Sequence, residues 1–281
     1  MKMIPFKIRP ALAAALFAVF FAAHFCSPAT AAGAYSRTAD GISIKTGGGE
    51  LRIMPRAANI IRVVFAPDPA TPDPKSFVVV GPAKKYTGWK VEEKNGAVAV
   101  VTPELRVTVN SGTGALSFLD AKGNIILREP DSGARTAVKT TVAGEQTYNA
   151  TQTFIATPDE GLYGLGQYQD GVMNYNGKDR VLAQANKIDI CPFLTSTAGY
   201  GILWDNASLT LFSAKDGKIA FGSKVADVID YSFVYGPDTD RIIAGYRTLT
   251  GRATMLPKWA MGYFQSKERY KSQDELVDIV K

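Results

Sequence analysis

The sequence predicts a mainly β protein, in which an antiparallel β-sandwich is followed by the start of a strand-and-helix domain. Short runs of alternating or β-branched residues recur from Ile42 to Phe233, with turn residues between them at close intervals. Asn95-Gly96 and Asp216-Gly217 lie between such runs, where a hairpin turn needs residues that tolerate positive φ. Many short strands at this spacing are typical of a sandwich. Near Pro237 the pattern changes to helical periodicity.

Residues 1–32 are predicted to be a secretory signal peptide that is removed from the folded protein. Lys2, Lys7 and Arg9 precede an apolar run, and an A-x-A cleavage sequence follows at 29–31. A membrane anchor is the competing interpretation, but the apolar run is shorter than the roughly 20 residues of a membrane span and has no positive flank after it. We therefore expect a periplasmic or secreted protein without a stable membrane anchor.

The charge of the mature chain argues against a nucleic-acid partner. Three of the 32 basic residues lie in the leader, so 29 remain beside 26 acidic residues, a net charge of +3. No run of Lys and Arg is left that could neutralise a phosphate backbone.

Cysteine and histidine are too scarce for several kinds of chemistry. Cys26 and His24 lie in the predicted leader, which leaves Cys191 as the one thiol and no imidazole. This excludes a disulfide within the mature chain, a histidine zinc site, and a catalytic Ser-His-Asp or Cys-His arrangement. Cys191 has apolar neighbours and is expected to be a buried, inert thiol. Catalysis would have to use carboxylates, lysine, tyrosine or a bound cofactor.

A short helix is predicted to close the β region. The stretch "PDTDRIIAGYRTLTG" places apolar side chains on one helical face and ends at a glycine stop signal. The predicted face consists of Ile242, Ile243, Tyr246 and Leu249.

The residues after this helix are predicted to start a second domain. "LPKWAMGYFQS" is an apolar run typical of a buried strand, and "SQDELVDIVK" begins an amphipathic helix with a capping box formed by Ser272 and Glu275. We divide the mature chain into a sandwich domain, 33–255, and this strand–helix unit, 256–281. One strand and one helix cannot form a parallel sheet, so we expect the chain to be part of a longer protein.

A glycine-rich stretch, "DEGLYGLGQYQDGVMNYNGKD" over 159–179, is the most unusual segment. Its glycine spacing does not match the dinucleotide-binding or P-loop patterns. Glycine instead allows the backbone to pass close to a neighbouring strand or ligand. Tyr163, Tyr168 and Tyr175 offer flat faces for sugar rings, or else they fill the edge of the sandwich. Gln184 and Asn186 follow in "LAQAN", and their amides suit a hydroxyl-rich ligand, although such residues also cap loops.

Five blocks of sequence in register resemble family 31 of the glycoside hydrolases, and within it bacterial α-xylosidases and α-glucosidases. The blocks are "YGLGQYQDGVMNYNG", "LAQAN", "STAGYGILWDNASLTLF", "YSFVYGPDTDRIIAGYRTLTG" and "MLPKWAMGYFQSKERYKSQDELVDIV". The resemblance implies a galactose-mutarotase-like β-sandwich followed by the truncated start of a (β/α)8 TIM barrel. "WAMGYFQS" would be the first barrel strand and "SQDELVDIV" the first barrel helix.

The resemblance also implies a function. By this resemblance the complete protein would be a retaining α-glycosidase. It would remove terminal α-xylosyl or α-glucosyl units from an oligosaccharide or polysaccharide-derived substrate, without a cofactor or metal. The two catalytic aspartates, held about 5 Å apart, would lie beyond this sequence. No catalytic residue is therefore assigned within it, and Asp170, Asp179, Asp189 and Asp205 are interpreted as turn or surface acids.

Four substrate-binding residues are predicted from the family's architecture, in which a sandwich loop reaches over the barrel mouth. Gln184 and Asn186 belong to the matching segment, 167–186, and Phe264 and Gln265 would lie near the top of the first barrel strand, where barrel sites are built.

Two alternatives to the enzyme interpretation stay open. The chain could be a non-catalytic carbohydrate-binding sandwich, with stacking faces from Tyr163, Tyr168, Tyr175 and Trp204, or a structural protein of the cell envelope. The sequence does not decide between xylose and glucose, identify the aglycone, or fix the oligomeric state.

Overall fold

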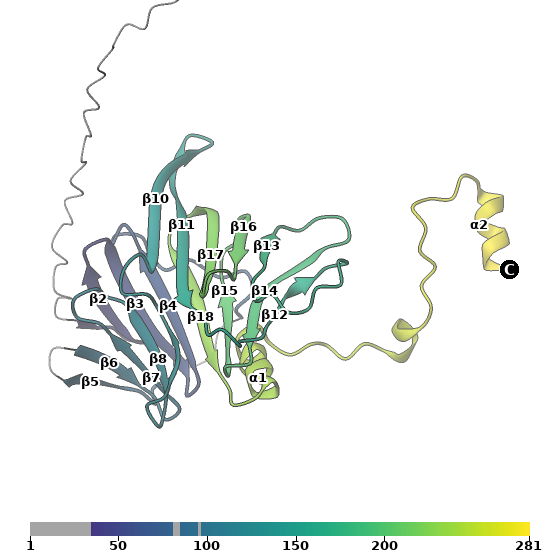
Figure 1. Cartoon of the computed structure of the whole chain (residues 1–281). Coiled ribbons are helices and arrows are strands. Elements are labelled where there is room, and N and C mark those ends of the chain that lie inside the picture. Colours follow the sequence, from purple (N-terminus) through teal and green to yellow (C-terminus); the bar gives the residue numbers. More distant parts are fainter. Residues whose placement is uncertain (1–34, 81–84, 95–96) are drawn as a thin grey trace, which may run out of the picture.

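The protein is a sandwich of two antiparallel sheets, seen in a computed structural model that describes residues 35–80, 85–94 and 97–281 (Figure 1). The predicted leader and the Asn95-Gly96 turn lie outside these residues. The first sheet has eight strands, in the order β1 Ser36–Arg37, β2 Ile42–Thr46, β3 Gly49–Ala57, β4 Ile60–Ala66, β18 Ile229–Tyr235, β15 Tyr200–Trp204, β14 Asp189–Ser196 and β12 Leu162–Gln167.

The second sheet has ten strands and includes a long hairpin. Its order is β13 Asp179–Leu182, β16 Thr210–Ser213, β17 Lys218–Ala226, β11 Glu145–Ile155, β9 Ile125–Arg128, β8 Leu116–Asp120, β7 Leu105–Val109, β6 Ala97–Val101 and β5 Lys90–Lys94. β10 Arg135–Val142 pairs with β11 and extends with it beyond the body of the sandwich (Figure 1). The predicted turn at Asp216-Gly217 is confirmed, because both residues have positive φ, 53° and 67°.

The core lies between the two sheets and follows the alternation that predicted the strands. In β7, for example, Leu105, Val107 and Val109 are buried while the residues between them are partly exposed. Large aromatic side chains fill the centre: Phe118 stacks on Phe233 with ring centroids 4.2 Å apart, and Phe154 meets Tyr231 edge to face at 5.3 Å. These contacts join strands from both sheets into one apolar core.

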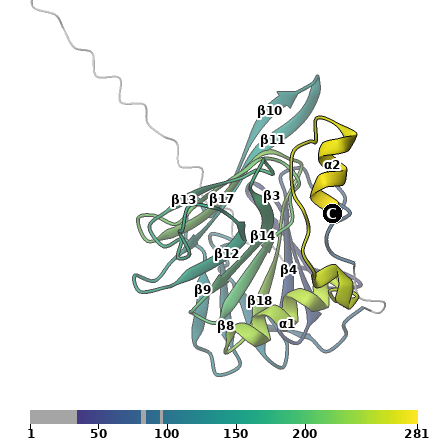
Figure 2. The same ribbon diagram turned by 90° about the vertical axis from the view of Figure 1, so that its right-hand side faces the viewer.

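The predicted helix is α1, Thr239–Thr250, which packs on the outer face of the first sheet against β18, β15 and β14 (Figure 2). Asp238 caps its start by accepting a hydrogen bond from the Arg241 amide at 2.8 Å. Ile242 and Leu249 are buried as predicted, but Ile243 is 38% exposed. The face of α1 that contacts the sheet is therefore narrower than the apolar face predicted for the helix.

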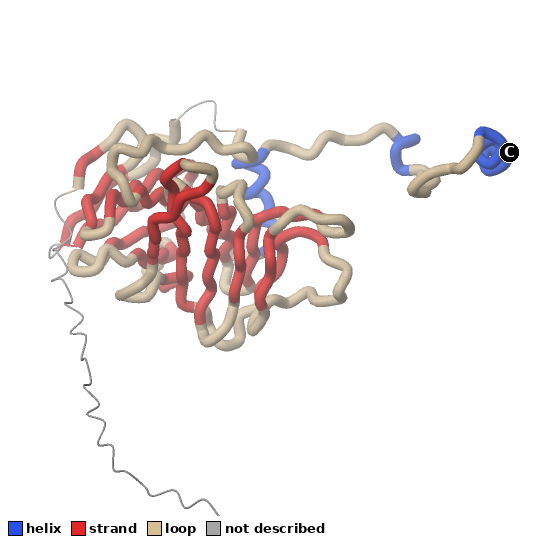
Figure 3. The backbone as a smooth tube through the Cα atoms, turned by 90° about the horizontal axis from the view of Figure 1, so that it is seen from above, coloured by secondary structure: helices blue, strands red, loops and turns tan. Residues whose placement is uncertain are grey.

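The strand predicted over 256–266 is not formed, and this prediction was wrong. Lys258–Met261 is a 3₁₀ turn, and the rest of the segment is loop that runs away from the sandwich (Figures 1 and 3). A barrel strand gains its hydrogen bonds from neighbouring strands on both sides, and no such neighbours are present in the described chain. Trp259 and Phe264 are accordingly 78% and 67% exposed.

The last predicted helix is confirmed as α2, Gln273–Val280. Ser272 Oγ accepts the Glu275 amide at 3.2 Å, which is one half of the expected capping box. The Glu275 carboxylate bonds the Lys271 amide at 2.8 Å instead of that of Ser272. The TIM-barrel assignment and the boundary at 255 stay predictions, since this segment does not contain a strand–helix pair.

Candidate functional site

A long loop that leaves the first sheet and returns to it forms the candidate site. We call residues 168–188, between β12 and β14, the excursion loop. Midway along it, β13 pairs with β16 in the second sheet, so the loop bridges the two sheets at one end of the sandwich. Both ends of the loop are fixed to each other, because β12 and β14 form an antiparallel pair.

The glycines of the predicted glycine-rich stretch lie inside β12 and allow it to approach β14. Gly164 and Gly166 have φ of 101° and 108°, and a Cβ atom there would lie 2.3 Å from the Phe193 carbonyl oxygen and 2.0 Å from that of Asp189. Neither position has room for a side chain. The prediction of a close backbone approach is confirmed, and the partner is a neighbouring strand.

A buried carboxylate fixes the start of β12. The Glu160 side chain accepts hydrogen bonds from the Thr157 amide at 3.0 Å, from Ser196 Oγ at 2.5 Å and from the Tyr200 hydroxyl. Burial, with the Glu160 charge beside it, raises the pKa of Tyr200 well above its usual range, so this hydroxyl stays protonated as a donor. Glu160 therefore ties the segment before β12 to β14 and β15.

Two asparagines brace the first half of the excursion loop against the same segment. Asn174 Oδ1 accepts the Leu162 amide at 3.0 Å, and Asn176 Nδ2 donates to the Glu160 carbonyl at 2.7 Å. The loop is thus held by side-chain amides where it has no sheet partner.

Arg180, at the start of β13, holds the two halves of the loop together. Its guanidinium carbon lies 4.8 Å from the ring centroids of both Tyr168 and Tyr175, and its Nη1 pairs with Asp170 at 2.5 Å. Sequence reasoning missed both Arg180 and Glu160, because nothing in the local pattern distinguishes them from solvated charges.

The aromatic faces proposed for a carbohydrate-binding module are mostly internal. Tyr175 and Trp204 are 3% and 1% exposed, and the Trp204 indole donates to Ser223 Oγ at 3.0 Å within the core. Tyr168 is covered by Arg180, which leaves Tyr163, 37% exposed, as the accessible ring of the four. The alternative in which Tyr175 and Trp204 stack on sugar rings is contradicted, since both side chains lie in the core between the sheets. For Tyr175 the other interpretation holds, in which the ring packs within the sandwich.

Gln184 organises the tip of the excursion loop. Its Nε2 donates to the Ile188 carbonyl at 2.7 Å and to Asp189 Oδ1 at 3.0 Å, while its Oε1 accepts the Ile190 amide at 3.0 Å. These bonds close a turn over 185–188, in which Lys187 has a φ of 69°. Most of the hydrogen-bonding capacity of Gln184 is therefore already used.

Asn186 lies at the exposed tip of that turn. Within the described part of the chain, no recorded hydrogen bond engages its side-chain amide, which leaves one acceptor and two donors free. Phe264 and Gln265 lie on the exposed segment beyond α1. This segment runs away from the sandwich, which carries Gln184 and Asn186 (Figure 3). The role of all four residues in substrate binding stays a prediction.

The aspartates and the cysteine discussed in the sequence analysis contact other side chains of the fold. Asp170 pairs with Arg180, and Asp179 pairs with Lys215 and accepts from Ser213 Oγ at 2.7 Å. Cys191 is half-buried, less than predicted, and its Sγ lies 3.4 Å from the Tyr246 hydroxyl. Burial, with Cys191 beside it, raises the pKa of Tyr246 to about 12.

Two further properties of the described residues bear on function. They contain no group of three or more His, Cys, Asp or Glu side chains placed to hold a metal ion. None of their helices has the length and apolar character of a membrane span.

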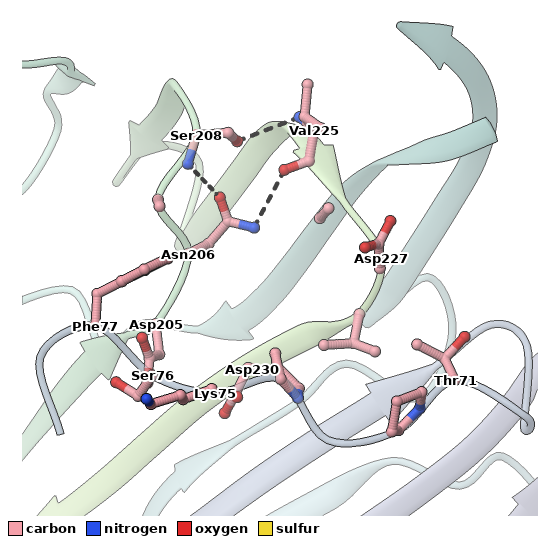
Figure 4. Close-up of a pocket in the computed structure, with 15 residues that line it drawn as sticks. Thr71, Lys75, Ser76, Phe77, Asp205, Asn206, Ser208, Val225, Asp227 and Asp230 are labelled. Atoms are coloured by element: carbon pink, nitrogen blue, oxygen red, sulfur yellow. Dashed lines mark hydrogen bonds between the residues drawn. The ribbon is translucent and has the colours of Figure 1, made fainter. Parts of the chain in front are cut away.

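A cleft of about 530 Å³ lies beneath the proline-rich segment 67–77, next to the turn that follows β15 (Figure 4). At its floor the buried Asp230 accepts a hydrogen bond from Arg62 Nε at 3.0 Å. Burial raises the pKa of Asp230 from 3.8 to about 6, against the hydrogen bonds from Arg62.

This raised pKa predicts a pH dependence of stability. The folded chain binds the Asp230 proton more tightly than the unfolded chain, so the contribution of this group is fully present below about pH 4 and is lost as the pH rises through about 6. The loss is about 3 kcal/mol. Asp230→Asn removes this titrating group. The free energy of unfolding of the wild type minus that of the variant, measured in urea, should therefore be about 3 kcal/mol higher at pH 4 than at pH 7. A difference that is independent of pH would contradict the raised pKa.

The fold defines the class of protein, a two-sheet sandwich of the galactose mutarotase-like kind, and sequence comparison places it in a family. Residues 50–212 match the model of the glycosyl hydrolase 31 N-terminal galactose mutarotase-like domain. This match covers more than half of the chain, which therefore belongs to glycosyl hydrolase family 31 and contains the family's N-terminal domain.

Individual relatives agree with that assignment. The chain is 36% identical over 234 residues to an alpha-xylosidase of Saccharolobus solfataricus, which covers 80% of this chain and 31% of that protein. A GH31 alpha-xylosidase from a soil metagenome, solved with xylose, has 30% identity and a TM-score of 0.78 over 88% of this chain and 39% of that one. The alpha-xylosidase of Xanthomonas citri has the same fold, with a TM-score of 0.79 and 24% identity over 87% of this chain and 43% of that one. The chain thus spans less than half the length of these relatives.

Proposed function

We propose that the chain is the amino-terminal part of an exported, retaining α-glycosidase that hydrolyses terminal α-xylosyl or α-glucosyl units. The family match over 50–212 carries this proposal, and relatives named as alpha-xylosidases support the choice of substrate. The signal-peptide pattern of residues 1–32 supports export. The catalytic aspartates would belong to the barrel that follows the sandwich in the complete enzyme.

Within that enzyme the excursion loop would form one wall of the sugar pocket. Asn186 lies exposed at the tip of the loop, where its amide makes no hydrogen bond to another described residue. Gln184 fixes the turn that presents it. We assign Asn186 as the direct contact to a sugar hydroxyl and Gln184 as a positioning residue, which refines the prediction that both bind the substrate directly.

Asn186→Ala in the enzyme that carries this sandwich on its barrel is expected to raise KM about tenfold, because one hydrogen bond of about 1.4 kcal/mol is lost. Gln184→Ala should raise KM and also accelerate amide hydrogen exchange at 185–190, since its three bonds close the turn. The matched control is Asn149→Ala, at an exposed position of β11 in the distant hairpin. Unchanged kinetics for Asn186→Ala, with the control also unchanged, would remove the loop tip from the pocket.

The chain alone is expected to be inactive. Incubated with p-nitrophenyl α-xyloside or α-glucoside, it should release no p-nitrophenol above the blank, because the nucleophile and acid/base lie in the barrel. Measurable activity that co-purifies with the chain would place the catalytic carboxylates in the sandwich. It would overturn the assignment of catalysis to the barrel.

A further inference from the structure

Three clefts adjoin along one side of the sandwich and form a continuous groove. The cleft of about 530 Å³ under segment 67–77 shares Thr71, Pro72 and Asp227 with a cleft of about 450 Å³ beside the β10–β11 hairpin. At its other end it shares residues 206–208 with a cleft of about 360 Å³ that Gln184 lines. The groove therefore runs from the hairpin to the base of the excursion loop.

The groove is lined by one exposed aromatic ring, by aspartates and by the lysines Lys75 and Lys139, and these polar groups can bond the hydroxyls of an uncharged sugar chain. Phe77 stands at its rim and is 91% exposed, so its ring offers a flat apolar face (Figure 4). The carboxylate of Asp205 faces the same cleft, and within the described residues no recorded hydrogen bond or ion pair engages it. Asp227 accepts one hydrogen bond, from Thr147 Oγ1 at 3.2 Å, and keeps further acceptor capacity.

The wall of the central cleft is rigid. Asn206 Oδ1 accepts the Ser208 amide at 2.8 Å, and its Nδ2 donates to the Val225 carbonyl at 3.2 Å. Ser208 Oγ in turn accepts the Val225 amide at 3.2 Å. These bonds, drawn in Figure 4, tie the turn after β15 to β17. The Asp205 amide also donates to the Asp230 carbonyl at 3.0 Å, so the backbone that carries Asp205 is held without a ligand.

We propose that this groove binds an oligosaccharide chain as an accessory site, outside the sugar pocket. The choice of ligand rests on the proposed function. A docked protein domain would remove the charged side chains of Asp205, Asp227, Lys75 and Lys139 from water. Among the described residues none of these four forms an ion pair, so burying them is costly. A sugar chain supplies hydroxyl donors to those carboxylates and a ring face to Phe77, and it can stay partly hydrated in an open groove.

The test is an amide NMR titration of the full chain with two α-linked tetrasaccharides, maltotetraose and isomaltotetraose. Binding of either should shift amides of residues 71–77, 205–208 and 225–228. Asp205→Asn and Phe77→Ala should each weaken binding about tenfold. The matched controls are Asp159→Asn and Trp259→Ala, an exposed acid and an exposed aromatic outside the groove, which should bind as the wild type does.

The outcomes separate this inference from the proposed function. Binding that Asn186→Ala weakens, but that Asp205→Asn and Phe77→Ala leave unchanged, would overturn the groove while supporting the loop tip as a sugar contact. No shifts at the groove with tens of millimolar tetrasaccharide would also overturn it, and the kinetic test of Asn186 in the complete enzyme would be unaffected.

Discussion

Glu129→Ala is expected to lower the free energy of unfolding by about 3–5 kcal/mol, a large part of the stability of a domain of this size. Glu129 is buried between the sheets and pairs with Arg135 Nη1 at 2.9 Å. It also accepts the Leu116 amide at 2.8 Å and Gln152 Nε2 at 2.9 Å. Alanine would leave a guanidinium, an amide and a backbone N–H buried without their acceptor.

The expected loss of stability is large because Glu129→Ala removes one partner of a buried ion pair and leaves the other. A buried charge without its partner costs more free energy than the intact pair contributes. Urea unfolding followed by near-UV circular dichroism would measure it. The double variant Glu129→Met with Arg135→Met should recover part of the loss, since no unpaired charge remains. A double variant as unstable as Glu129→Ala would show that packing, and not the unpaired charge, is responsible.

Lys215→Ala is the matched control, because it removes one partner of a solvent-exposed ion pair. Lys215 pairs with Asp179, and their side chains are 49% and 56% exposed. Solvent screens such a pair, so the substitution should change stability by less than about 1 kcal/mol. An effect as large as that of Glu129→Ala would contradict the dependence on burial.

Gly166→Ala is expected to destabilise the sandwich by roughly 2–5 kcal/mol, from an unfavourable φ together with a steric overlap. The new Cβ would lie 2.0 Å from the Asp189 carbonyl oxygen and 2.8 Å from the Cys191 nitrogen, so β12 and β14 would have to separate. Because these strands anchor the excursion loop, we also expect faster hydrogen exchange throughout residues 168–188.

Gly171→Ala separates the two causes of that loss. Gly171 also has a positive φ, 73°, but no atom lies within 4 Å of its hypothetical Cβ. Its substitution should cost only about 1–2 kcal/mol for the left-handed backbone. Equal losses at Gly166 and Gly171, measured by urea unfolding, would mean that the close approach of β12 to β14 is unimportant.

The sequence predicted those features of the fold that depend on local periodicity. Alternation located the strands, the apolar face and the glycine stop signal located α1, and the capping box located α2. The glycines of β12 predicted a close approach of two backbones, since only a residue without Cβ tolerates one. Such signals are carried by the chain itself and need no knowledge of its neighbours.

Features that depend on the partner surface were missed. The sequence shows that Tyr175 and Trp204 have flat aromatic faces, but whether other parts of the chain cover those faces is decided by the tertiary fold. Glu160 and Arg180 have no local signal of burial, because their partners come from β14, β15 and the excursion loop. The strand predicted from Leu256 failed for the same reason, since an apolar run becomes a strand only beside other strands.

The way the excursion loop is attached has a consequence for how specificity can change. β12, β14 and the Glu160 network fix its base, whereas the turn at 185–188 is held by the Gln184 side chain and by one backbone hydrogen bond, from the Ile188 amide to the Ala185 carbonyl at 3.2 Å. Residues at this tip can therefore be replaced, or the turn lengthened, while the base keeps its geometry. Variation in a sandwich of this kind can then concentrate in a few exposed residues, and ligand preference can diverge faster than the stability of the domain that carries it.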